Sequence, residues 1–213
     1  MAKQSGPDLE QAYALETPED SVRLYRDWAA SYDKGFAAAQ GYVYPARVAE
    51  VFRARARVGD APVLDVGAGT GLLGAAVGRG EIDALDISPE MLEQAAAKGV
   101  YRSTIVGDLT QTLDLAKGTY GAVTSSGTFT LGHVGPEALG ELLRVAKPGA
   151  LFCLGINAAA FDKYGFGSTI AALVADGRIT APDYVRVRFY ETADHDHADE
   201  AGYVTVFRKR IAP

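Results

Sequence analysis

One stretch, Val63 to Gly74, constrains the fold of this chain more than any other, because VLDVGAGTGLLG joins an apolar run to a glycine-punctuated turn and a helix-forming segment. The run from Val63 to Val66 predicts a buried parallel strand. Gly67, Gly69 and Gly71 let the backbone turn tightly and approach a ligand closely. Such a turn exposes unpaired N–H groups of the next helix, whose positive dipole end favours acceptor or anionic groups. A ligand is therefore expected above this turn.

The spacing of the glycines helps to choose between two nucleotide-type cofactors. A dinucleotide fingerprint is G-x-G-x-x-G, whereas here the order is Gly67-Ala68-Gly69-Thr70-Gly71, and Leu72 occupies the place of the third fingerprint glycine. This G-x-G-x-G, preceded by Asp65, resembles the S-adenosylmethionine loop of class I methyltransferases. In that family the loop backbone lies against the methionine part and the ribose of the cofactor. A purely structural tight connection is the alternative interpretation.

Composition limits the organisation of the chain and the classes of partner. A chain of 213 residues is long enough for one α/β domain with a full core. The net charge of -6 argues against nonspecific binding to nucleic acid, which needs clustered Lys and Arg. The first residues, MAKQSGPDLEQA, lack the apolar core of a secretory signal, and no run approaches the ~18 residues of a membrane helix. We therefore expect a cytoplasmic protein without a membrane partner.

The sequence before the glycine loop predicts a flexible tail over residues 1–17 and a helical cap over residues 18–58, followed by a Rossmann-like core over residues 59–213. The apolar and aromatic stripe of the cap has helical spacing, which by itself favours core packing over ligand contact. The run YRDWAASYDKGF nevertheless resembles the W-A-x-x-Y-D cap of many small-molecule methyltransferases. Because the tyrosine of that cap closes over the methionine end of the cofactor, the resemblance makes Tyr32 a candidate cofactor contact, with Trp28 nearby.

Two aspartates come at the carboxyl ends of the next two predicted strands, where doubly wound sheets bind ligands. Asp86 ends the predicted strand over 82–87, and a carboxylate there can accept both hydroxyl hydrogens of a ribose. The alternative role, capping the next helix, is better filled by Ser88. The pair Gly107-Asp108 follows the predicted strand over 103–106, where the aspartate can accept from the exocyclic amine of adenine. Taken alone, this pair also fits an ordinary turn.

Small and hydroxylated residues follow the fourth predicted strand, over 120–125, as a loop over 126–134 at the same edge of the sheet. The turn KPGA, at 147–150, leads into the fifth predicted strand, over 151–156, which Asn157 ends. These small side chains would permit a substrate and a cofactor to approach each other closely.

The last third of the chain alternates apolar and polar residues over 185–191 and 203–211, which predicts antiparallel strands. Between them, DHDHADE at 194–200 holds two histidines among carboxylates. An H-x-H of this kind can bind a divalent cation. In a polar connection between strands it more often belongs to a solvated acidic loop, so we assign no metal.

Four signatures therefore occur in order, each after a predicted strand: the glycine loop, Asp86, Asp108 and the loop that begins Ser126-Gly127-Thr128. On these motifs the chain from about Tyr25 to Ile211 resembles a class I S-adenosylmethionine-dependent methyltransferase. The resemblance implies a Rossmann-like three-layer α/β/α sandwich. Its seven-stranded, mostly parallel sheet would have the order 3-2-1-4-5-7-6, with the last strand antiparallel and a helical cap at the N-terminus.

A narrower resemblance rests on longer stretches of the same sequence. VLDVGAGTGLLG, ALDISPEMLEQAAAKGVY, SGTFTLGHVGPEAL and LLRVAKPGALFC resemble the methyltransferase-like group named for the Williams-Beuren syndrome chromosomal region, which brings no defined substrate. The cofactor that the resemblance implies is S-adenosyl-L-methionine. The contacts to it would be Tyr32, Asp65, Gly67, Ala68, Gly69, Thr70, Gly71, Asp86, Ile87, Met91, Gly107, Asp108, Leu109, Ser125, Ser126 and Gly127.

Methyl transfer from a sulfonium is an in-line displacement, in which a protein mainly positions the acceptor and excludes water. An acceptor of high pKa also needs a base, and His133 is the candidate catalytic residue because it is the only histidine near the predicted reaction centre. A structural histidine that caps the following helix is the alternative. The residues expected to line the acceptor pocket are Tyr44, Thr128, Phe129, Asn157, Phe161 and Tyr164.

The acceptor itself is expected to be a small metabolite. The N/D-P-P-Y/F motif of many amino methyltransferases is absent after the fourth strand, and no cysteine suits C5 methylation of a base. Two other functions stay open: a protein that binds S-adenosylmethionine without catalysis, and a nicotinamide-dependent oxidoreductase, which the missing third glycine disfavours. We expect a monomer or a homodimer without a nucleic-acid partner.

Overall fold

The computed structural model describes residues 23, 24, 26, 28, 29, 32 and 33 and the ranges 41–78, 80–191 and 200–211. The tail expected over 1–17 lies outside the described residues. So does most of the predicted cap before residue 41, as well as the acidic connection over 194–199. These expectations therefore stay predictions.

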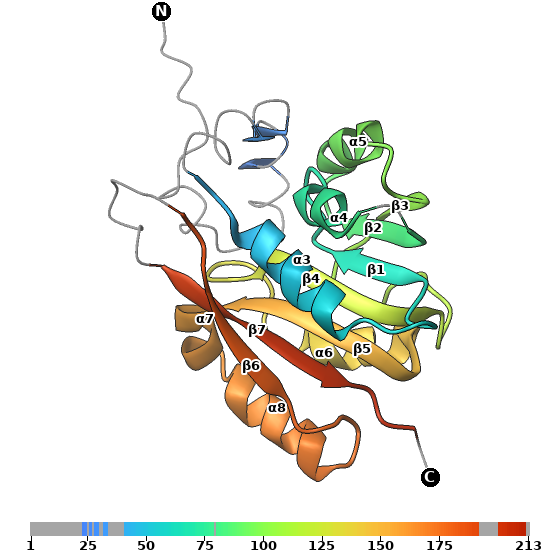
Figure 1. Cartoon of the computed structure of the whole chain (residues 1–213), viewed down its shortest axis with the longest axis vertical. Coiled ribbons are helices and arrows are strands. Elements are labelled where there is room, and N and C mark those ends of the chain that lie inside the picture. The colour runs from blue at the N-terminus through green and yellow to red at the C-terminus, as the bar shows by residue number, and fades with distance from the viewer. Residues whose placement is uncertain are drawn as a thin grey trace, which may run out of the picture.

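Seven strands of the described residues form one sheet. They are β1 (Val63–Val66), β2 (Ile82–Asp86), β3 (Ser103–Val106), β4 (Tyr120–Phe129), β5 (Ala146–Asn157), β6 (Asp183–Arg188) and β7 (Ala201–Arg208). Their order across the sheet is β3-β2-β1-β4-β5-β7-β6 (Figure 1). Neighbours from β3 to β5 are parallel, while β7 is antiparallel to both β5 and β6. The predicted order and the reversed strand are confirmed.

Helices cover both faces of this sheet (Figure 1). They are α3 (Tyr44–Arg55), α4 (Leu72–Val77), α5 (Pro89–Ala97), α6 (Ala138–Val145), α7 (Ala158–Lys163) and α8 (Phe166–Ala175). The first three pack on one face and the last three on the other, as the separate apolar cores show. The three-layer arrangement is thus present, and none of the described helices has the length and apolar character needed to cross a bilayer.

The strand β5 shows why the sequence folds into two cores. Leu151 and Cys153 point into the core under α3, whereas Phe152 and Leu154 point into the core under α6 and α8. A strand buried on both faces reads as a continuous apolar run. Cys153 is fully buried, and this burial raises the pKa of its thiol to about 12, as suits a structural cysteine.

Two strands are longer than the sequence predicts. Strand β4 continues through Ser126 to Phe129, and β5 begins at Ala146, before the KPGA turn. Serine and glycine have weak strand propensity, but here β5 pairs with β4 at both ends of that strand, through shifts of register. The predicted end of the fourth strand and start of the fifth were therefore wrong, because pairing with neighbours outweighed local propensity.

The helix α5 begins as predicted. Its N-cap is Ser88, whose hydroxyl accepts a hydrogen bond from the backbone N–H of Met91 over 3.2 Å, and Pro89 occupies the first turn. Because Ser88 fills this role, the side chain of Asp86 is not needed to cap the helix.

Candidate functional site

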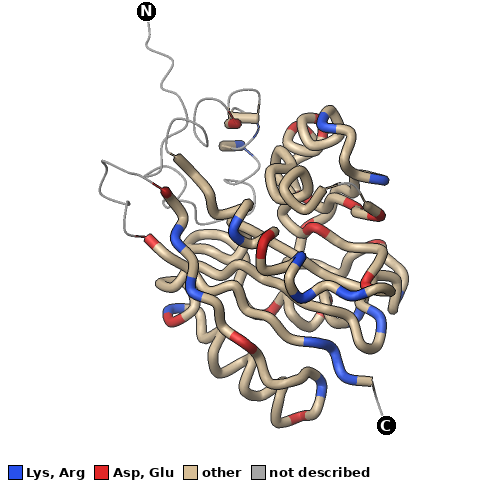
Figure 2. The backbone as a smooth tube through the Cα atoms, in the orientation of Figure 1, with Lys and Arg blue, Asp and Glu red and all other residues tan. Residues whose placement is uncertain are grey.

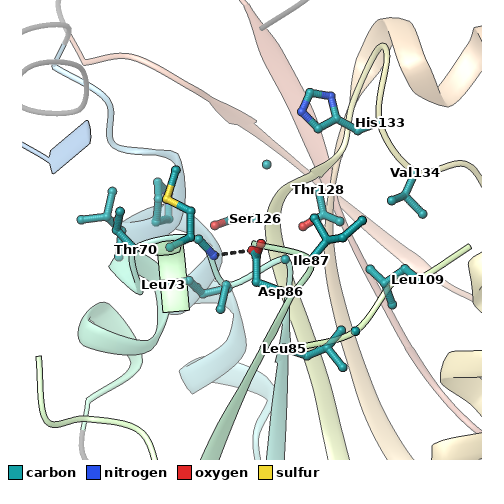
Figure 3. Close-up of a pocket in the computed structure, with 18 of the residues that line it drawn as sticks. Thr70, Leu73, Leu85, Asp86, Ile87, Leu109, Ser126, Thr128, His133 and Val134 are labelled. Carbon is teal, nitrogen blue, oxygen red and sulfur yellow. Dashed lines mark hydrogen bonds between the residues drawn. The ribbon is translucent and has the colours of Figure 1, made fainter. Parts of the chain in front are cut away.

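One cavity lies at the carboxyl edge of the sheet, above the ends of β1, β2 and β3 and beside the end of β4 (Figure 3). Parallel strands bring their carboxyl ends to the same edge, which is where open α/β sheets bind ligands. Most of the residues that the sequence assigns to the cofactor line this cavity. They are Tyr32, Gly67, Ala68, Gly69, Thr70, Asp86, Ile87, Met91, Gly107, Asp108, Leu109, Ser126 and Gly127.

The glycine loop has the backbone that only glycine adopts without strain. Gly67, Gly69 and Gly71 have φ values of 62°, 53° and 86°, all in the left-handed region. A Cβ on Gly67 would lie 2.0 Å from Oγ1 of Thr128, so this glycine is also required by the close approach of β4. Gly71 caps α4 without a side-chain hydrogen bond. At Gly67 and Gly69 the loop therefore presents backbone rather than side chains to the cavity.

Asp86 faces the cavity from the end of β2 (Figure 3). Its Oδ2 accepts from the N–H of Gly69 over 2.7 Å, and its Oδ1 accepts from the N–H of Ser88 over 2.9 Å. Burial raises the pKa of Asp86, and these backbone donors partly oppose the shift. Each carboxylate oxygen can accept more than one hydrogen bond, so Asp86 is fixed in orientation and retains capacity for a ligand's hydroxyl groups.

Asp108 occupies the corresponding position after β3. Its Oδ1 accepts from both the N–H and the hydroxyl of Thr110, over 2.8 and 2.7 Å. This is the local turn that the sequence also allowed. Both donors share one oxygen, so the turn orients the carboxylate and leaves Oδ2 for a ligand donor. The turn and the adenine contact are thus compatible roles.

His133 lies at the same cavity, above Thr128 in Figure 3. Its Nδ1 is 2.9 Å from the carbonyl oxygen of Leu131. A carbonyl only accepts, so Nδ1 carries the hydrogen and the lone pair of the neutral ring is on Nε2. Burial lowers the pKa of His133 below its ordinary value of 6.5, against the opposing effect of the Leu131 carbonyl. The neutral ring, which can accept a proton, is therefore favoured near neutral pH.

Hydrogen bonds from two hydroxyl groups link β4 to the end of β1 below the cavity. Ser125 and Thr128 both donate to the carbonyl oxygen of Val66, over 2.8 and 2.9 Å. Ser125 is fully buried and does not line the cavity, so it supports the site from behind. Thr128, expected at the acceptor, does line the cavity.

Asp65 and Gly71, which the resemblance assigns to the cofactor, are not among the described residues that line the cavity. Asp65 is 1% exposed, and its Oδ2 accepts from the hydroxyl of Tyr101 over 2.7 Å. Its Oδ1 has no hydrogen-bond partner among the described residues. Burial raises the pKa of this carboxyl to about 7. Asp65 therefore acts on the loop from below.

Tyr101 is a residue that the sequence did not point to. Its hydroxyl oxygen accepts from the N–H of Gly74 over 3.2 Å while it donates to Asp65. A Cβ on Gly71 or Gly74 would come within 2.8 or 2.3 Å of this side chain. The tyrosine thus supports the loop and the first turn of α4. No local pattern reveals this, because Tyr101 is 27 residues from Gly74 in the chain.

The other residues expected at the acceptor do not line the cavity. Tyr44 is buried under the sheet, in the core around α3. Phe129 is buried in the opposite core, where its ring meets Phe166 edge-on at 5.7 Å. Asn157 caps α7 by accepting from the N–H groups of Ala159 and Ala160. These three side chains therefore have packing and capping roles in this structure.

Phe161 and Tyr164 also lie away from the cavity wall. Phe161 packs edge-on against Tyr184 and Tyr203, at 5.6 Å from each ring centre. Tyr164 accepts a hydrogen bond from the N–H of Gly132 over 3.0 Å. Since Gly132 does line the cavity, Tyr164 supports its wall from outside.

The cavity has further walls that sequence reasoning missed. Tyr42 and Pro45 line the cavity, whereas the residue that the sequence predicts there is Tyr44, which lies between them in the chain. The remaining lining residues are Leu72, Leu73, Leu85, Thr110, Gly132 and Val134. In the ranges that the structure describes, no group of three or more His, Cys, Asp or Glu side chains is arranged to hold a metal ion.

Comparisons with known proteins agree with this geometry. A family model described as a methyltransferase domain matches residues 63–149. Methyltransferase-like protein 27 of Homo sapiens is 35% identical over 169 residues, which cover 72% of this chain and 67% of the human protein.

Two solved structures show the same fold at low identity. The [4+2]-cyclase SpnF has a TM-score of 0.67 and 17% identity and covers 98% of this chain and 100% of its own. A TehB-like S-adenosylmethionine-dependent methyltransferase from Corynebacterium glutamicum has a TM-score of 0.59 and 21% identity and covers 85% and 96%. Because one of these is named as a cyclase, the fold does not by itself determine the reaction.

Proposed function

Since the chain belongs to the class I S-adenosylmethionine-dependent methyltransferases, we propose that it transfers the methyl group of this cofactor to a small-molecule acceptor. The observation that carries the proposal is the convergence of the glycine loop, Asp86, Asp108 and His133 on one cavity. The first three are the features that would hold an adenosyl group, and the fourth is a candidate base beside it.

The residues of the cavity fit S-adenosylmethionine. The side-chain-free loop at Gly67 and Gly69 gives the ligand close access to the backbone. Asp86 is oriented to accept from the two ribose hydroxyls, and Asp108 has an oxygen for the adenine amine. When bound, the cofactor supplies an electrophilic methyl group with the thioether as leaving group. The half-buried Tyr32 would cover its methionine end.

The contribution of His133 would be to hold and remove a proton from the acceptor. Nε2 carries the lone pair of the neutral ring because Nδ1 donates to Leu131. A hydroxyl or carboxyl acceptor that donates to Nε2 would be oriented toward the cofactor and deprotonated as it attacks. Ser126 lines the same cavity, and its hydroxyl would orient the acceptor's polar atoms, whereas the hydroxyl of Thr128 donates to the carbonyl oxygen of Val66.

The charge distribution supports a small acceptor rather than a polynucleotide. Figure 2 shows Lys and Arg interspersed with Asp and Glu over the described chain, instead of gathered in one stripe. No Lys or Arg is among the described residues that line the cavity. A nucleic-acid substrate needs clustered cations near the site. An uncharged acceptor hydroxyl suits the cavity better than a polyanion.

Two measurements test this proposal in sequence. Calorimetry with S-adenosylmethionine, its demethylated product and NAD is expected to show binding of the first two only. Methyl transfer from labelled cofactor is then followed across a metabolite extract, with wild-type protein and His133→Gln. We expect a labelled product with the wild type and at least about tenfold less with the variant, since general-base catalysis contributes ~100-fold or more. Cofactor binding without any labelled product would instead indicate a non-catalytic binding protein.

The pH dependence offers a second check on His133. Its neutral form is the active one, and its pKa is lowered by burial. The rate should therefore be constant near neutral pH and fall only as the pH drops through a value below 6.5. If the rate instead fell as the pH was lowered through a value above 7, another group would be the base.

A further inference from the structure

A salt bridge outside the cavity joins the glycine loop to the neighbour of Tyr32. Lys98, the C-cap of α5, places Nζ 2.5 Å from Oδ2 of Asp33 and 2.6 Å from the carbonyl oxygen of Thr70. Thr70 in turn donates its hydroxyl to Oδ1 of Asp33 over 2.5 Å. Both oxygens of the Asp33 carboxylate are therefore held, one by the glycine loop itself and one by a lysine bound to that loop.

This three-residue cluster of Asp33, Thr70 and Lys98 lies directly behind the wall of the cavity. Thr70 and Tyr32 line the cavity, whereas Asp33 and Lys98 do not. The side chains of Lys98 and Asp33 are 23% and 36% exposed, and an ion pair of that exposure contributes little to folding. It does fix the position of Asp33, and Tyr32 is only one peptide bond away.

We propose that Lys98 is a positioning residue for the cofactor site: by holding Asp33 against Thr70, it keeps Tyr32 at the cavity wall. The inference rests on the cofactor binding of the proposed function. Lys98 does not line the cavity, so its effect would pass through Asp33 and the loop. It joins three parts of the chain, residue 33, the loop at residue 70 and the end of α5, that the sequence alone does not connect.

The expected effect is on affinity rather than on the chemical step. A wall held in place before the ligand arrives lowers the ordering cost of binding. Removing the lysine leaves Asp33 and the Thr70 carbonyl without their charged donor. Asp86 and His133 have no bond to the lysine and keep their own hydrogen bonds, to the N–H of Gly69 and the carbonyl of Leu131. Binding should weaken, and the rate at saturating cofactor should change little.

The test compares three variants by calorimetry with S-adenosylmethionine and by initial rates. Lys98→Met keeps the length of the side chain and removes its charge. We expect the Kd to rise about tenfold with kcat within about twofold of the wild type, as for loss of a charged hydrogen bond. Lys98→Arg should retain most of the affinity. Arg55→Met is the matched control, because it breaks an ion pair to Asp183 of the same 2.5 Å length away from the cavity, and its Kd should equal that of the wild type.

Repeating the Lys98 substitution in a Tyr32→Ala variant distinguishes an effect on the position of Tyr32 from a general effect on the loop. In Tyr32→Ala protein, Lys98→Met should weaken binding no further, because the group that the lysine positions is already gone. A full additional tenfold loss in that background would overturn the proposed route through Tyr32. If Lys98→Met binds the cofactor as tightly as wild-type protein, the inference alone falls. If wild-type protein does not bind S-adenosylmethionine, the proposed function falls and takes the inference with it.

Discussion

The strand β2 carries two aspartates with opposite surroundings, three residues apart. Asp83, near its amino end, accepts from Nε and Nη2 of Arg102 over 2.9 and 2.6 Å and from the hydroxyl of Tyr120 over 3.1 Å. Asp86, at its carboxyl end, accepts from backbone N–H groups and has no ion pair with the described residues. One carboxylate is neutralised by a cation, and the other is not.

Their pKa shifts differ in sign for this reason. Burial opposes ionisation of both carboxyls, but the hydrogen bonds from Arg102 hold the pKa of Asp83 below its ordinary value. At Asp86 burial prevails and the pKa is raised. The comparison teaches that the donors to two aspartates of one strand distinguish the structural residue from the one that lines the cavity, and that the latter lies at the carboxyl edge of the sheet.

The largest expected effect is on cofactor affinity when Asp86 is removed. Asp86→Ala deletes the proposed acceptor for both ribose hydroxyls, and two charged hydrogen bonds are worth about 100-fold in affinity or more. Calorimetry with S-adenosylmethionine measures the Kd, and thermal unfolding serves as the control for folding. A Kd within about threefold of the wild type would mean that Asp86 does not bind the ribose.

The corresponding substitution of Asp83 should lower the stability of the protein and leave its affinity for the cofactor unchanged. Asp83→Asn removes the charge that pairs with Arg102 and should lower the free energy of unfolding by about 2 kcal/mol. Urea denaturation measures this change, and calorimetry should give an unaltered Kd. If the Kd rose as much as in Asp86→Ala protein, the division between the two ends of β2 would be wrong.

Substitution of Asp108 is expected to have a smaller effect, on the selectivity of the site for adenine. Asp108→Ala removes the proposed acceptor for the adenine amine and should weaken the binding of S-adenosylmethionine about tenfold. Analogues that lack the exocyclic amine test this assignment, because the wild type should lose affinity for them while the variant binds both forms alike. Equal binding of the two ligands by the wild type would contradict the adenine contact.

The smallest expected effect is a change in stability near neutral pH, caused by a third buried carboxyl, that of Asp65. Its folded-state pKa is raised to about 7 from an ordinary 3.8, so folding favours the protonated form. This contribution is complete below the unfolded pKa, declines steadily as the pH rises above that value, and is lost once the pH passes about 7. The free energy of unfolding of cofactor-free protein should thus fall by about 1 kcal/mol between roughly pH 6 and 8, relative to Asp65→Asn. Parallel curves for the two proteins would show that Asp65 is ionised throughout.

Much of the fold was predictable because its signals are local. Glycines at Gly67, Gly69 and Gly71 fix a backbone that other residues avoid, and a doubly buried strand such as β5 is apolar along its length. The positions of Asp86 and Asp108 follow from the rule that parallel strands end at one edge. The cavity lined by these residues was therefore expected from the sequence.

The acceptor side was not predictable in the same way. Tyr44 and Phe129 are aromatic residues of the kind that often line pockets, but they are buried in opposite cores. The face of the sheet on which a side chain lies depends on strand register and packing rather than on residue type. Tyr101 and Lys98 escaped notice because their partners are distant in the chain. Contacts of this range appear only when the elements are assembled.

The phenol of Tyr101 fills the volume that side chains at positions 71 and 74 would need. A relative with alanine at position 74 must therefore carry a smaller residue at position 101, and then loses the hydroxyl that reaches Asp65. We therefore expect residues 65, 74 and 101 to co-vary among relatives. An alignment of the family can test this expectation without any experiment on the protein.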